Sequence, residues 1–408
     1  MTTPVTTDVA REAGSPREYA GATQHSHGAG APVPVQTRSE RPVSYDVADF
    51  SVPTNREAAW KYSPVAKLAP LFAEGLDGSR VEAGDPGVDG VKIAYVGRDD
   101  ARIGQAGIPE DRSSANAWSS FQEALVVEVS GEEQKTAIIE RSGFGDAARA
   151  AHVIVDVKQH ARGLVILRHT GAAKLAENVE ILVGDGANVT IVSLQEWDDE
   201  ALHASSHFIA VGRDAYVKHI VVSLGGDVVR LNPTLHLNDQ GADGELFGLY
   251  YADAGQHLEQ QVYVDHAAPH TRSRVNYKGA LQGEGARSVW IGDVLIRREA
   301  EGTDSYEENR NLILSDGTRA DSVPNLEIET GDIEGAGHAS ATGRFDDEQL
   351  FYLMARGISE AQARRLVVHG FLNEIVQQID SEEIASQLQE MLERELERSG
   401  NALLGAAQ

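Results

Sequence analysis

The sequence contains no cysteine among its 408 residues. Disulfide bonds, thiolate zinc sites and a cysteine nucleophile are therefore excluded for this chain. A metal or cluster held here must use histidine, aspartate or glutamate, or thiolates supplied by another protein. Aromatic residues make up only 6% of the chain, which disfavours a carbohydrate enzyme, because sugar sites usually stack their ligands on aromatic rings.

Basic residues are also few, since 36 Lys and Arg stand against 63 Asp and Glu, for a formal net charge of -27. Such a chain repels phosphate backbones and anionic lipid, so neither nucleic acid nor a membrane is the expected partner. No apolar stretch approaches the roughly 18 residues of a membrane span. Residues 1–10 lack the basic start and apolar core of a secretory signal, so we expect a cytoplasmic protein.

Three common catalytic motifs are absent from the sequence. It has no G-x-x-x-x-G-K-[ST], so no ATP site is expected in this chain. It also has neither the G-x-S-x-G elbow of serine hydrolases nor the H-E-x-x-H of metalloproteases. Catalytic carboxylates cannot be selected among so many acidic residues, so a β-helix polysaccharide lyase or hydrolase stays open at this point.

The N-terminal third divides into two regions by composition. Residues 1–43 are rich in Thr, Pro, Gly, Ala and Ser, which indicates a disordered lead-in. Residues 44–124 are predicted to form a helical and mixed region. Within it, helical spacing over 54–68 is interrupted by prolines, and a short helix is predicted at 119–125.

Short β-rich runs fill residues 125–345, which we predict to be the core of the protein. The runs are rich in Val, Ile and Tyr and are separated by Gly, Asp and Asn turns; they include Leu125–Val129, His152–Val157, Leu164–Leu167, Val179–Val183, Val189–Leu194, Phe208–Val211, Tyr216–Leu224 and Leu246–Tyr251. No long amphipathic helix lies between them. This argues against a doubly wound sheet, which needs crossover helices.

The remaining architectures for this mainly β region are a sandwich, a large barrel and a stacked solenoid. A sandwich of this length would be awkwardly large, whereas a solenoid can keep adding coils. The length therefore favours a parallel β-helix, although the sequence shows no strict repeat.

Residues 346–400 are predicted to be helical, with 401–408 as a tail. Ser359, with Gln362 three residues later, and Ser381 are the expected N-caps. Apolar stripes at helical spacing follow the two caps, consisting of Leu372, Ile375, Val376, Ile379 and of Ile384, Leu388, Met391, Leu392, Leu396 up to about Arg398. Such helices fit either a module that docks a partner or a cap on the end of the solenoid, and the pattern does not decide between them.

Histidines are the candidate metal ligands of a chain without thiols. The pairs His203/His207 and His266/His270 have i, i+4 spacing, which in a strand places the side chains about 13 Å apart, too far to share an ion. His338 differs because glycine and alanine flank it and leave its imidazole open to a partner. The alternative interpretation of His338 is a histidine that is hydrogen-bonded in a turn.

Seven segments follow one another in a fixed order. They are Pro53–Tyr62 (PTNREAAWKY), His266–Gly279 (HAAPHTRSRVNYKG), Arg310–Asp316 (RNLILSD), Ala320–Ile328 (ADSVPNLEI), Gly337–Gly343 (GHASATG), Leu350–Ile358 (LFYLMARGI) and Gly370–Phe371. Together they resemble the signature of the SufB/SufD family of iron–sulfur cluster assembly proteins. A series of this length and order is far more specific than a single glycine-rich loop.

The resemblance implies a mainly β fold, with a parallel β-helix core between N-terminal and C-terminal helical segments. It implies a non-catalytic scaffold subunit of the SUF complex, paired with a SufB-like paralogue and bound to a SufC-like ABC ATPase. ATP would then be handled by the partner, which explains the missing P-loop. In the family the ATPase docks on the C-terminal helical module, here at Tyr352, Arg356, Gly357 and Phe371.

The SufD branch is the better match, because SufB relatives carry a cysteine at the position aligned with Arg310. The resemblance makes His338 a ligand of a transient nascent cluster shared with the SufB-like chain, since imidazole replaces thiolate in some clusters. Many relatives have a cysteine where this chain has Ala336, so the cluster is expected to depend more on partner thiolates. A purely structural subunit without a cluster ligand is the alternative.

Overall fold

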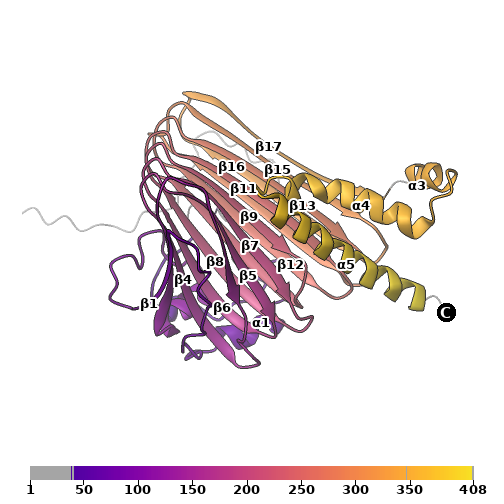
Figure 1. Ribbon diagram of the computed structural model, residues 1–408, viewed down its shortest axis with the longest axis horizontal. Helices are drawn as coiled ribbons and strands as arrows, with labels where there is room; N and C mark the ends of the chain where they lie inside the picture. The colour runs from indigo at the N-terminus through magenta and orange to yellow at the C-terminus, as the bar shows by residue number, and fades with distance from the viewer. Residues whose placement is uncertain (1–37, 39–40, 346, 407–408) are drawn as a thin grey trace, which may run out of the picture. The chain divides into compact units, whose positions relative to one another are not determined.

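The computed structural model describes residues 38, 41–345 and 347–406. Nearly all of the lead-in expected at 1–43 lies outside these residues, as does the end of the expected tail. Two long β-sheets dominate the described residues (Figure 1). None of the helices in the described ranges has the length and apolarity needed to cross a membrane.

Successive strands alternate between the two sheets, so each coil of the chain adds one strand to each sheet. The nine-stranded sheet contains, in spatial order, β1 (Val91–Gly97), β2 (Glu123–Val129), β4 (Ala148–Val157), β6 (Lys174–Val183), β8 (Leu202–Val211), β10 (Val228–Leu237), β12 (His257–His266), β14 (Arg287–Ile296) and β16 (Arg319–Ile328). The eight-stranded sheet contains β17 (Ile333–Arg344), β15 (Thr303–Ile313), β13 (Arg272–Leu281), β11 (Asp243–Ala252), β9 (Tyr216–Ser223), β7 (Asn188–Trp197), β5 (Arg162–Gly171) and β3 (Lys135–Arg141).

This arrangement is a parallel β-helix, so the predicted solenoid is confirmed. β1 pairs with β2 antiparallel, and the pairs from β2 and β3 onward are parallel. The coils differ in length: Leu202 pairs with Val228, 26 positions later, whereas Arg287 pairs with Arg319, 32 positions later. The turns absorb the difference, which explains why the sequence shows β-rich runs without a strict repeat.

Side chains from both sheets fill the interior of the solenoid, and large rings pack there against glycine. A Cβ atom added at Gly279 would lie 1.7 Å from the ring of Tyr250, and one at Gly248 would lie 2.0 Å from the ring of Tyr277. All four residues come from the neighbouring strands β11 and β13. Glycine is therefore required at these positions by the close approach of the rings.

The region before the solenoid packs on the nine-stranded sheet. It contains the 3-10 turns η2 (Val47–Asp49) and η3 (Ala58–Trp60) and the helices α1 (Val65–Phe72) and α2 (Arg112–Ser120). The helix predicted at 119–125 is wrong in position. α2 begins earlier because Asp111 accepts a hydrogen bond from the Ser114 backbone N–H, and residues 123–129 join the sheet as β2.

Three helices follow the solenoid, α3 (Asp347–Met354), α4 (Glu360–Val376) and α5 (Glu382–Ala406). Ser359 and Gln362 form the predicted capping box of α4. The backbone N–H of Ile384 donates to the hydroxyl of Ser381, the predicted cap of α5. α5 continues past the predicted end at Arg398.

The apolar stripes of α4 and α5 pack against the side of the eight-stranded sheet rather than on an end of the solenoid (Figure 1). Leu164, Val192 and Leu249 on the outward face of β5, β7 and β11 share one buried cluster with the stripes. Two ion pairs anchor the same contact, Lys278 with Glu374 at 2.6 Å and Lys218 with Asp380 at 3.1 Å. The stripes therefore stabilise the chain itself and leave other faces of the helices exposed.

Candidate functional site

His338 lies in β17, the outermost strand of the eight-stranded sheet. It sits within a strand and not in a turn, because its neighbours pair in register with β15. The side chain is 43% exposed. The imidazole is thus open to solvent on the last coil of the solenoid, where a partner protein can reach it.

Glu307 of β15 lies directly opposite His338 in the strand register. Its side chain is completely buried, and its Oε1 lies 3.8 Å from Nδ1 of His338, beyond hydrogen-bond distance. Burial and then the charge of Asp293 raise the pKa of Glu307 to about 8, opposed in part by the Asn325 backbone N–H. Neither carboxylate oxygen accepts a well-formed hydrogen bond among the described residues.

The next inward-facing residues of β15 are, by contrast, well bonded. Asn311 accepts from the Tyr250 hydroxyl at 2.6 Å and donates to Asn309 Oδ1 at 2.8 Å. Asn309 also accepts from Ser322 at 2.6 Å. The fold therefore satisfies the other polar side chains on this strand, and Glu307 is the exception beside His338.

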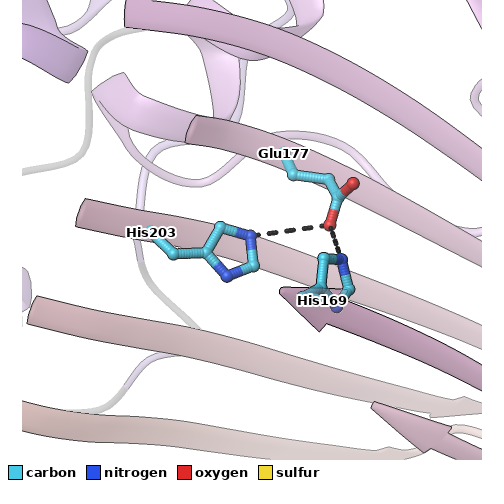
Figure 2. Close-up of side chains that lie close together, drawn as sticks. All are labelled: His169, Glu177 and His203. Atoms are coloured by element: carbon cyan, nitrogen blue, oxygen red, sulfur yellow. Dashed lines mark hydrogen bonds and ion pairs between the residues drawn. The ribbon is translucent and has the colours of Figure 1, made fainter. Parts of the chain in front are cut away.

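A second group of potential metal ligands lies deep inside the solenoid (Figure 2). Glu177 of β6 points at His169 of β5 and His203 of β8. Its Oε2 lies 3.1 Å from Nε2 of His169 and 3.5 Å from Nε2 of His203. All three side chains have no exposed surface, and their potential ligand atoms lie within 4.8 Å of one another.

The group around Glu177 already holds a cation, the guanidinium of Arg141, 2.9 Å from Glu177 Oε1. Burial alone would raise the pKa of Glu177, but His169, His203 and Arg141 hold it well below its ordinary value. His203 Nδ1 is engaged by Gln195 Oε1 at 2.8 Å. A divalent ion here would lie beside a buried positive charge, so we interpret this group as a structural ion-pair network.

Comparison with known proteins decides the family of the chain. The family model described as "SUF system FeS cluster assembly, SufBD core domain" matches residues 139–371. An iron–sulfur cluster assembly SufBD family protein of Mycobacterium tuberculosis H37Rv is 48% identical over 371 residues, covering 87% of this chain and 92% of the relative. A Mycobacterium leprae member is 47% identical over 367 residues, covering 86% and 93%.

The chain belongs to the SufBD family. A second SufBD family protein of M. leprae is 28% identical over 219 residues, covering 54% of this chain and 25% of that protein. M. tuberculosis H37Rv likewise has a second member at 28% identity. Organisms with a close relative of this chain thus also encode a more distant paralogue.

The four residues that the sequence suggested for partner docking fall in two different environments. Tyr352 is exposed, and the guanidinium of Arg356 lies 4.2 Å from the centre of its ring. Gly357 follows α3 with a φ of +87°, a conformation that suits glycine. Phe371 is partly buried in the cluster between α4 and the sheet, with Lys278 Nζ 5.1 Å from its ring centre, so it serves the chain's own packing.

The sequence predicted His338 as a candidate ligand but did not single out the carboxylates of Glu177 and Glu307. The histidines of the i, i+4 pair His203 and His207 contact different residues. His203 lies beside Glu177, whereas Nδ1 of His207 lies 2.9 Å from Nε2 of His219. Glu177 and Glu307 meet histidines 8 to 31 positions away in other strands. The sequence contains 63 acidic residues. The one sequence feature that could have pointed to Glu307 is an inward-facing position in a β-rich run, and many other residues share that feature.

Proposed function

We propose that this chain is the SufD-type scaffold subunit of a SUF iron–sulfur cluster assembly complex, without catalytic activity of its own. It pairs with a SufB-like paralogue and binds a SufC-like ABC ATPase, and His338 helps to hold the nascent cluster at the interface. The observation that carries the proposal is the solvent-accessible imidazole of His338 on the terminal strand of a SufBD-family chain that has no cysteine.

The SufD assignment rests on chemistry that the chain lacks. Arg310 stands where SufB relatives are expected to carry a cysteine, and its side chain is 53% exposed on β15. A chain without thiols cannot carry sulfur as a persulfide, so sulfur must arrive on the partner. Imidazole from this chain and thiolates from the paralogue would then share the cluster.

The strand edges of the last coil support pairing with the paralogue. β16 and β17 end their respective sheets, and each presents an edge without a strand partner among the described residues. Exposed edges of this kind pair readily with another chain. Because His338 lies on β17, a paralogue that binds this coil would meet the imidazole.

Binding of the ATPase is supported by the exposed face of α3 and α4. Phe351, Tyr352, Met354 and Leu366 are large apolar side chains that lie exposed there. Exposed large apolar side chains that form a patch commonly mark a protein contact. The buried stripes of α4 and α5 hold the helices on the solenoid, so this other face is free to bind a partner.

The test is co-purification of the wild-type chain with its SufB-like and SufC-like partners, followed by measurement of bound iron and sulfide. His338→Ala should still form the complex but lose most of its cluster. Equal cluster content in both would reduce the chain to a scaffold without a ligand. Failure of the wild-type complex to form would contradict the proposed function as a whole.

A second arm tests the docking face. Tyr352→Asp should lower recovery of the ATPase while leaving the paralogue bound, because a charge replaces an exposed ring. Val52→Asp is the matched control, since Val52 is equally exposed but lies in the N-terminal region. Equal loss of the ATPase in both variants would contradict docking on α3.

A further inference from the structure

We propose that Glu307 is a second iron ligand of the His338 site, so that this chain offers one carboxylate and one imidazole to the same iron ion. The inference rests on the proposed function, because it needs iron to arrive at His338. It assigns to the interior of the solenoid a part in binding that surface residues alone do not reveal.

The first support is that Glu307 is a buried carboxyl whose oxygens are poorly satisfied by their surroundings. Its side chain has no exposed surface, and neither oxygen accepts a well-formed hydrogen bond among the described residues. Such a group is costly to bury and is normally bonded or paired. Its neighbours Asn309 and Asn311 obey that rule, so Glu307 is the exception among these inward-facing residues of β15.

The second support is that the fold keeps space for this carboxylate. Gly292 of β14 lies across the interior, and a Cβ atom added there would stand 2.4 Å from Oε2 of Glu307. The same added atom would stand 2.3 Å from the ring of Trp290. Any larger residue at position 292 would displace the carboxylate or the ring.

The third support is the geometry with His338. Two ligands of one ion, each about 2.1 Å from it, stand roughly 3.0 to 3.4 Å apart. Glu307 Oε1 and His338 Nδ1 are 3.8 Å apart, so a small side-chain rotation brings both within bonding distance. Imidazole with carboxylate is a ligand set that suits ferrous iron and leaves coordination positions open. Sulfide and the partner's thiolates would fill those positions.

Glu177, another of the buried glutamates that lie beside histidines, has a different set of neighbours. Glu177 also faces histidines, but Arg141 neutralises it at 2.9 Å. Within the described part of the chain, the one ion-pair contact of Glu307 is with His338 itself, and no arginine or lysine lies within 4.0 Å of its oxygens. Among the described residues, a cation at Glu307 would therefore meet free carboxyl oxygens and no positive side chain, whereas at Glu177 it would meet Arg141.

The test uses the full complex with both partners and compares wild type, Glu307→Gln, His338→Ala and Glu308→Gln. Glu308→Gln is the matched control, because Glu308 is the next residue, faces outward and pairs with Arg310. The readouts are iron per complex and the rate at which a chelator removes that iron. We expect removal to be at least about tenfold faster in Glu307→Gln and His338→Ala and unchanged in Glu308→Gln.

The outcomes separate the inference from the function on which it rests. Fast iron loss in His338→Ala with wild-type behaviour in Glu307→Gln overturns the ligand role of Glu307 and leaves the proposed function intact. Wild-type behaviour in both overturns the ligand role of His338 and the inference with it. Fast loss in Glu307→Gln alone overturns the shared ion.

Thermal melting of the same variants controls for folding. Glutamine keeps the shape of Glu307 but cannot ionise to bind iron as a carboxylate, so Glu307→Gln should melt no lower than wild type while holding iron less well. A melting temperature that falls together with the iron content would assign Glu307 a structural role instead. If that complex fails to assemble, Glu307→Asp withdraws the carboxylate from His338, and wild-type iron retention in it would overturn the inference.

Discussion

Arg230 is a buried cation that joins the N-terminal region to the nine-stranded sheet of the solenoid. It lies on β10, is 1% exposed, and places its guanidinium 2.7 Å from Asp111 and 3.2 Å from Glu259. The same guanidinium lies 3.9 Å from the ring centre of Trp60. Asp111 caps α2 and Glu259 belongs to β12, so one side chain links three elements that are distant in sequence.

The cost of removing Arg230 follows from the carboxylates that it would leave behind. Burial alone would raise the pKa of Glu259, but the hydrogen bond from His257 and the charge of Arg230 hold it at about 2. The pKa of Asp111 is likewise lowered, against its burial, by Arg230 and by hydrogen bonds from residues 113 and 114. Breaking a buried pair by removing one partner costs about 3–5 kcal/mol. We expect Arg230→Met to destabilise the chain by that amount at neutral pH.

The assay is urea denaturation of the full-length chain at pH 7. The triple variant Arg230→Met, Asp111→Asn, Glu259→Gln should recover a large part of the loss, because no buried charge is then left unpaired. Arg319→Met is the control, since Arg319 is 64% exposed in its pair with Asp321 and should cost less than about 1 kcal/mol. The reasoning is refuted if Arg230→Met resembles this control, or if the triple variant is no more stable than the single one.

Two further predictions follow from other buried groups. Burial lowers the pKa of His219 from 6.5 to about 3, so between these pH values the imidazole is protonated in the unfolded chain but neutral in the folded one. The free energy of unfolding therefore falls as the pH drops from 6.5 towards 3, by about 1.4 kcal/mol per pH unit. The urea midpoint should be lower at pH 5 than at pH 7, and His219→Gln should reduce that difference. Gly279→Ala would place a methyl group 1.7 Å from the ring of Tyr250 and should destabilise the chain by about 1–3 kcal/mol. Removing the ring relieves the clash, so the double variant Gly279→Ala, Tyr250→Leu should lose less stability than the sum of the two single variants. Additive losses would contradict the clash.

Local signals predicted the elements well. Runs such as Val189–Leu194 lie inside strands because β-branched residues suit the pleated, buried surface, and Ser359 with Gln362 forms the capping box that its spacing predicted. The helix predicted at 119–125 failed because pairing with β1 and β4 draws residues 123–129 into the sheet. Local propensity cannot anticipate such pairing, which depends on distant residues.

By itself, the sequence determined the β-rich core, the helical end, the absence of thiol chemistry and the family motifs that single out His338. Only the tertiary structure decided which side chains meet. The coils vary in length from 26 to 32 positions, so no fixed spacing in the sequence places Glu307 behind His338 or Glu177 beside Arg141. Strand register across coils sets these contacts, and the burial that follows leaves Glu307 without a counter-charge while Glu177 has one.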